Sequence, residues 1–86
     1  MKNNELDDLS RYFRLYRYRD EGDILEDEYG ELEEIIKRNE TVKKIEDARV
    51  KWIFKKISEE EFTTIFDEAF NNFMAAKDYK LIKKRK

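Results

Sequence analysis

Apolar residues along this chain recur mostly at intervals of three and four, which is the period of an amphipathic α-helix. A first helix is predicted from about Glu5 to Arg19. One half of its helical wheel carries the apolar and aromatic side chains of Leu6, Leu9, Tyr12, Phe13, Leu15 and Tyr16. Gly22 suits a left-handed C-terminal cap, and Asp23 is expected to cap the next helix with Glu26 in the capping-box position.

A second helix is predicted over residues 24–38, where one face aligns Leu25, Tyr29, Leu32 and Ile36. Gly30 inside this helix costs about 1 kcal/mol relative to Ala. Either another backbone approaches the glycine or the helix boundary is misplaced. Around residues 39–41 the pattern permits a turn or a single continuous helix, and both remain open.

The third segment, about 41–57, is predicted to be helical from the spacing of Val42, Ile45, Trp52 and Ile53. Residues 48–55 also alternate like a strand and include β-branched and aromatic side chains. An α+β fold with a short strand at residues 48–55 is therefore the alternative.

The last helix is predicted to begin at a capping box formed by Ser58 and Glu61. Its wide apolar stripe consists of Phe62, Ile65, Phe66, Ala69, Phe70, Phe73 and Met74. A stripe of this width is expected to be buried against two neighbouring helices. From Tyr79 onward we expect a frayed helix or a flexible basic extension.

These elements predict an all-α fold, a small antiparallel bundle of three or four helices. Its expected core comprises Leu9, Phe13, Leu32, Ile36, Ile45, Phe62, Phe66, Phe70 and Phe73. The length of 86 residues predicts one helical domain, residues 1–79, followed by a basic tail, residues 80–86. No apolar run approaches the roughly 20 residues of a membrane span and no signal peptide opens the chain, so a cytoplasmic location without membrane contact is expected.

The absence of Cys and His removes the commonest nucleophiles, general bases and metal ligands from the chain. The many carboxylates lie in solvated runs, and a small helical hairpin offers little enclosed volume in which to raise a pKa. The sequence therefore predicts a protein that is not an enzyme, with no catalytic residues, no metal site and no cofactor.

Charge is segregated along the chain, although its net value is only −2. Residues 20–34 carry nine acids and no base, and residues 43–57 carry six bases against two acids. Residues 77–86 carry six bases against one acid. Such alternation suits helices that pair with their neighbours as they fold back.

One candidate binding surface is a strip on one face of the first predicted helix, formed by Arg11, Arg14, Arg17 and Tyr18. Guanidinium groups beside an aromatic ring suit phosphates, a stacked base or an acidic protein surface. In the structural alternative, Asp7 pairs with Arg11 at i,i+4 and the acids of residues 20–34 neutralise the other arginines.

A second candidate surface combines Arg49, Trp52 and Lys56 on one stripe of the third predicted helix. An indole between cations is a common interface anchor. The structural alternative places Trp52 in the core, beneath the aliphatic stems of the two cations.

The basic tail suggests nucleic-acid binding, although it equally suits a solubilising end without a partner. In that hypothesis phosphates are bound by Arg11, Arg14, Arg17, Lys80, Lys83, Lys84, Arg85 and Lys86.

The leading functional hypothesis is a non-enzymatic protein–protein interaction module. It is a small regulator or inhibitor, of the phage or mobile-element type, that docks on a host or partner macromolecule. The hypothesis rests on segregated charge and two cation–aromatic clusters in a chain too small and chemically too poor for catalysis. The alternatives are a nucleic-acid-binding protein and a self-associating subunit, such as a homodimer, whose aromatic stripe completes its core only in the assembly.

Overall fold

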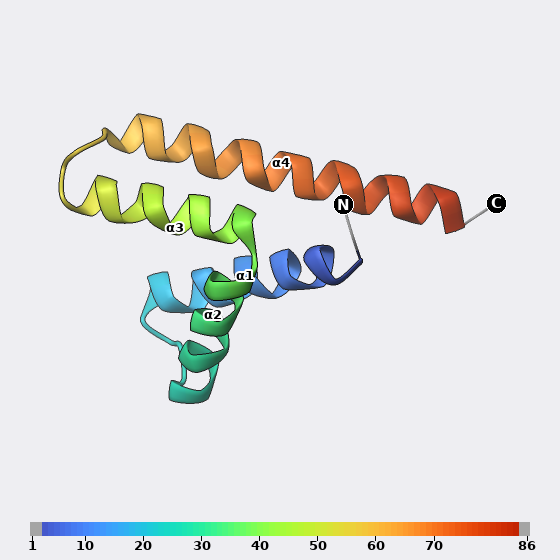
Figure 1. The fold of residues 1–86 in the computed structure, drawn as a ribbon, viewed down its shortest axis with the longest axis horizontal. Helices are drawn as coiled ribbons and strands as arrows, with labels where there is room; N and C mark the ends of the chain where they lie inside the picture. Colours follow the sequence, from blue (N-terminus) through green and yellow to red (C-terminus); the bar gives the residue numbers. More distant parts are fainter. Residues whose placement is uncertain (1–2, 85–86) are drawn as a thin grey trace. The chain divides into compact units, whose positions relative to one another are not determined.

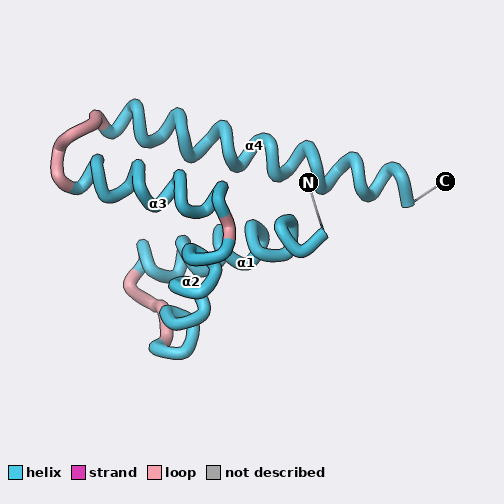
Figure 2. Tube along the Cα trace, viewed as in Figure 1, coloured by secondary structure: helices cyan, strands magenta, loops and turns pink. Residues whose placement is uncertain are grey.

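The fold is all-α, as the sequence predicts. The computed structural model describes the backbone of residues 3–84 and the side chains of residues 4–77. Four helices follow one another along this part of the chain: α1 (Asn3–Glu21), α2 (Glu26–Arg38), α3 (Glu40–Ile53) and α4 (Glu59–Lys84). Residues 48–55 contain no strand, so the α+β alternative is wrong (Figures 1 and 2). The chain divides within α3 into two compact units, residues 2–43 and residues 44–86. The proposed division at residue 79 stays a prediction.

The first unit is built on an antiparallel hairpin of α1 and α2. Asp8 near the start of α1 pairs with Arg38 at the end of α2, and Arg11 pairs with Glu31. The buried apolar side chains of this unit are Leu6, Leu9, Tyr12, Leu15, Leu32, Ile35 and Val42. The α1 residues lie on the predicted half of the wheel. On α2, however, Leu32 is buried with Ile35, whereas Ile36 is half-buried and Tyr29 is exposed.

The turn between α1 and α2 begins as predicted and ends differently. Gly22 has a φ of 78°, and its amide donates to the Arg19 carbonyl while the Asp23 amide donates to the Tyr18 carbonyl. This is the Schellman arrangement, which needs a left-handed residue at the position of Gly22. Asp23 does not cap α2, because the helix begins at Glu26 and its N-cap position falls on Leu25.

The cap of α2 is provided by a side chain inside the helix. The backbone amide of Leu25 donates to the Glu28 carboxylate at 3.1 Å. Glu26, Asp27 and Glu28 also place three acids in the first turn, where the helix dipole favours negative charge. The Leu25 side chain plays no part in the cap, and it is 66% exposed.

Asn39 separates α2 from α3, so residues 24–57 do not form one continuous helix. Its backbone is extended, with φ −112° and ψ 115°, and its amide donates to the Ile35 carbonyl at the end of α2. Its Oδ1 accepts from the Val42 amide at 3.1 Å, which caps the start of α3. A single buried asparagine therefore terminates one helix and begins the next.

The second unit is a hairpin in which the remainder of α3 and the first part of α4 lie side by side (Figure 1). The Trp52 and Phe62 rings stack with centroids 4.9 Å apart and planes 9° from parallel. The Ser58 Oγ accepts from the Glu61 amide at 3.1 Å, which confirms the predicted N-cap of α4. The third helix ends at Ile53 and not at residue 57 as predicted, because the chain turns at Lys55, whose φ is 61°.

The wide stripe of α4 is only partly buried. Phe62 and Phe73 are buried and Phe66 and Ala69 are half-buried, whereas three members are more than one-third exposed: Ile65, Phe70 and Met74. Phe70 was expected in the core, and Phe13 and Ile36 are likewise only half-buried. The backbone of α4 continues as helix to Lys84, so a non-helical extension from Tyr79 is wrong for residues 79–84, whereas the expected fraying of this helix end stays a prediction.

Candidate functional site

The arginine strip of α1 is largely engaged by carboxylates. Arg11 makes a bidentate contact with Glu31, with Nε–Oε1 and Nη2–Oε2 distances of 2.9 and 3.0 Å, and its Nη2 lies 3.9 Å from Glu28. The hydrogen bond from Arg11 lowers the pKa of Glu31. The expected partner of Arg11 was Asp7, four residues earlier, and that expectation is wrong. Two acids of residues 20–34, a run that the structural alternative assigned to the other arginines, pair with this one instead.

A second bidentate pair, absent from the sequence predictions, closes the other end of the hairpin. Arg38 donates to both carboxylate oxygens of Asp8 at 2.6 and 3.0 Å. The Arg38 hydrogen bond holds the pKa of Asp8 below its ordinary value, and the side chain of Asn39 acts in the same direction. These residues are 30 positions apart, so only the hairpin register brings them together.

The remaining members of the strip differ from one another. Arg17 is exposed and contacts Glu21 within its own helix at 3.4 Å. Tyr18 is half-buried, whereas Arg14 is exposed and makes no ion pair with another described residue. The four members therefore do not form one free cationic surface, and Arg14 alone is available to a partner without exchange of an ion pair.

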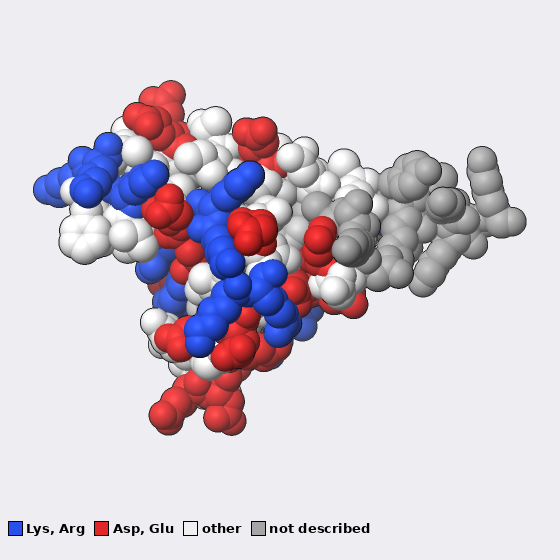
Figure 3. Space-filling model, in the orientation of Figure 1, with Lys and Arg blue, Asp and Glu red and all other residues white. Residues whose placement is uncertain are grey.

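A different surface combines exposed apolar side chains with free cations. Val50 and Ile53 lie on α3 and Phe54 directly follows the helix, at the spacing i, i+3 and i+4, and their exposed fractions are 47, 52 and 70%. Lys55 and Lys56 follow at once, both exposed and neither in an ion pair with another described residue. We call these five residues the turn surface. Basic and uncharged side chains share the end of this unit where α3 joins α4 (Figure 3).

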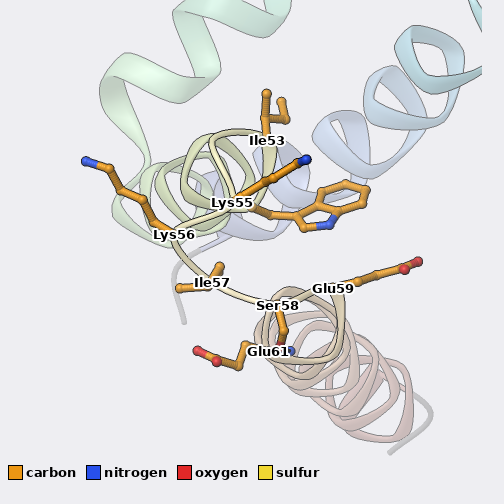
Figure 4. Close-up of a pocket in the computed structure, with 8 residues that line it drawn as sticks. Ile53, Lys55, Lys56, Ile57, Ser58, Glu59 and Glu61 are labelled. Atoms are coloured by element: carbon orange, nitrogen blue, oxygen red, sulfur yellow. Dashed lines mark hydrogen bonds between the residues drawn. The ribbon is translucent and has the colours of Figure 1, made fainter.

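The turn surface borders an open cavity of about 690 Å³. Trp52, Ile53, Lys55 and Lys56 line it from the α3 side, and Ser58, Glu59 and Glu61 line it from the start of α4. Lys55 and Lys56 point to opposite sides of the turn (Figure 4). The two ammonium groups therefore do not cluster at one point.

The predicted cluster of Arg49, Trp52 and Lys56 is only partly assembled. Lys56 lies beyond the end of α3, so it does not share a helical stripe with the other two. Trp52 stacks on Phe62 but is only half-buried, so it does not take the full core position of the structural alternative, and it lines the cavity with Lys56. Arg49 is half-buried and is not among the residues that line the cavity.

Sequence reasoning missed Val50, Ile53 and Phe54 as surface residues. Their helical spacing is that of a core face, and nothing in the sequence says that the face stays open. Of the basic tail, the side chains of Lys80, Lys83 and Lys84 and the whole of Arg85 and Lys86 lie outside the described residues.

No protein-family model, curated protein or solved structure matches this chain. None of the helices, within the described residues, is both long and apolar enough to cross a membrane. The same residues contain no group of three or more acidic side chains that could hold a metal ion.

Proposed function

We propose that the chain is a non-enzymatic interaction protein that docks through the turn surface on an acidic, partly apolar surface of another protein. The observation that carries this proposal is Phe54, which is 70% exposed beside two lysines that make no ion pair with another described residue. Such a module acts by occupying its partner, which suits a small regulator or inhibitor.

The apolar residues supply the affinity in this proposal. Full burial of a Phe or Ile side chain contributes roughly 1.5–3 kcal/mol. Aromatic anchors flanked by cations are typical of the residues that dominate binding energies. Lys55 and Lys56 add electrostatic complementarity, which speeds association and selects an acidic partner over a basic one.

The backbone at Lys55 supports the same interpretation. A left-handed conformation costs a non-glycine residue roughly 1–2 kcal/mol, and glycine adopts it freely. Lys55 nevertheless occupies this position with a φ of 61°. Strained residues concentrate where a side chain is needed for function. A lysine here costs stability relative to glycine but puts a positive charge at the residue that follows Phe54.

Phosphate binding has less support. Arg11 and Arg17, two of the four arginines assigned to it, already contact carboxylates. A polyanion must break these pairs before it gains the arginines, whereas an acidic protein reaches Lys55 and Lys56 directly.

The test uses a synthetic amphipathic peptide of about 20 residues in which Glu and Leu alternate at helical spacing. Binding is followed at micromolar protein by the fluorescence of Trp52, the single tryptophan. We expect Phe54→Ser to weaken binding at least tenfold and Lys55→Gln/Lys56→Gln to weaken it more at low salt than at high salt.

Arg14→Gln is the matched control, because it removes one exposed positive charge outside the turn surface. It should leave peptide binding unchanged within twofold. Equal losses for Arg14→Gln and Phe54→Ser contradict the proposed site, as does a wild-type chain that does not bind the peptide. Circular dichroism of each variant separates loss of binding from loss of the helices.

A further inference from the structure

The exposed face of α2 is a second surface whose apolar residues the fold leaves open. Leu25 is 66% exposed and Tyr29 is 46% exposed. Glu26 and Glu33 lie three residues before and four residues after Tyr29, so they share its face of the helix. Both carboxylates are exposed, and neither makes an ion pair with another described residue. We call Leu25, Glu26, Tyr29 and Glu33 the α2 surface.

Gly30 is the next residue after Tyr29, and the fold gives no internal reason for it. A Cβ atom added to Gly30 meets nothing within 4 Å, so neither a close backbone nor a helix boundary explains the glycine. A glycine in a helix interior costs about 1 kcal/mol relative to Ala. Because Gly30 has no side chain, a large side chain of a partner can pack against the helix beside Tyr29.

The α2 surface and the turn surface are complementary in kind. One presents two apolar side chains beside carboxylates, and the other presents three apolar side chains beside two ammonium groups. Residues 20–34 contain no base, so acidic side chains gather over the start of α2 (Figure 3). The α2 surface therefore has the chemistry that the turn surface is proposed to recognise.

We infer that the turn surface of one copy docks on the α2 surface of a second copy. This inference rests on the proposed function, because it names one occupant of the same site. The two surfaces differ, so the contact is heterologous: where two copies meet, one keeps a free α2 surface and the other keeps a free turn surface. The assembly grows beyond a dimer or closes into a ring, unlike a twofold homodimer formed through the aromatic stripe of α4.

Sedimentation equilibrium of the full chain, from about 10 μM to 1 mM, tests this contact, because interfaces of a few anchors are weak. We expect the mass of the wild type to rise past that of a dimer with concentration. The rise should be much smaller at 300 mM than at 25 mM salt, because screening weakens exposed charge pairs.

Two charge-reversed variants isolate the two surfaces. Lys55→Glu/Lys56→Glu disables the turn surface, and Glu26→Lys/Glu33→Lys disables the α2 surface. Each variant alone should be monomeric, since its remaining surface finds no complement on an identical copy. In an equimolar mixture the two unchanged surfaces complement each other, and so do the two reversed surfaces. Mixing the variants should therefore restore the association of the wild type.

Tyr29→Ser is a second test of the α2 surface, because it removes an apolar side chain without reversing a charge at the helix N-terminus. A monomeric wild type at 1 mM overturns the inference, and so do single variants that associate as strongly as the wild type. If the wild type binds the acidic peptide through Phe54 but stays monomeric, only this inference falls. If it neither binds the peptide nor associates, the proposed function falls as well.

Discussion

At the scale of single residues, Lys55 holds a left-handed backbone conformation that is unfavourable for a residue with a side chain. Among described residues other than glycine, it alone has a positive φ, at 61°. Its amide donates to the Trp52 carbonyl and the Lys56 amide donates to the Lys51 carbonyl, which is the hydrogen-bond pattern made at Gly22. Lys55→Gly should therefore raise the free energy of unfolding by about 1 kcal/mol, measured by urea denaturation with Trp52 fluorescence.

Lys56→Gly is the control for this prediction, because Lys56 lies in the same turn without a positive φ. Glycine there adds only flexibility to the unfolded chain, so stability should fall slightly or stay constant. Equal gains for both substitutions contradict the conformational explanation and point instead to relief of charge repulsion between the two lysines.

At the scale of secondary-structure elements, the bidentate pair of Asp8 and Arg38 fixes the register of α1 against α2. The Asp8 side chain is only 16% exposed, whereas that of Arg38 is 58% exposed, so solvent screens the pair in part. A double-mutant cycle with Asp8→Asn and Arg38→Gln should give a coupling free energy of about 0.5–1 kcal/mol. A coupling near zero shows that apolar burial alone sets the register.

Gly30→Ala tests the one helix-interior glycine. The added methyl group meets no described atom within 4 Å, so only the helical preference of the residue changes. We expect a gain of about 1 kcal/mol and a rise in Tm of about 4–8 °C by calorimetry. An unchanged or lower Tm shows that this part of α2 is not stably helical in solution.

The sequence predicts the existence of the helices well and their edges less well. Period and capping residues place all four helices, because Gly22 and Ser58 have local roles that no distant contact alters. The ends of α2 and α3 shift because Glu28, and not Asp23, caps α2, and because Lys55 stops α3 in a conformation that its residue type disfavours. Asn39 carried a usable signal, since asparagine before Glu40 is a common N-cap.

At the scale of the whole molecule, the candidate sites depend on facts that the sequence does not contain. Charge blocks indicate that helices pair, but only the hairpin register shows that Arg11 meets Glu31 and Arg38 meets Asp8. An apolar face such as that of Ile53 and Phe54 has the same spacing whether it is buried or open. The turn surface is therefore a product of where α3 ends and could not be predicted from composition or periodicity.

The same two ion pairs make stability depend on pH in acid. Hydrogen bonds from Arg38 and Arg11 lower the pKa values of Asp8 and Glu31 from ordinary values of 3.8 and 4.5. Between the unfolded and folded values the unfolded chain binds more protons, so stability falls as pH falls. The contribution is complete above about pH 5 and disappears as the pH drops through the lowered folded values.

Thermal unfolding between pH 7 and pH 2 measures this dependence. Asp8→Asn/Glu31→Gln should lower Tm at pH 7, and it should flatten the decline below pH 5 relative to the wild type. As the pH falls through the lowered pKa values of the two wild-type carboxylates, the difference in Tm between the two proteins should narrow. Glu68→Gln, an exposed carboxylate of α4, is the control and should leave the wild-type profile in place. The double variant removes both bidentate pairs. If its Tm still falls below pH 5 as steeply as that of the wild type, other carboxylates cause the loss of stability in acid.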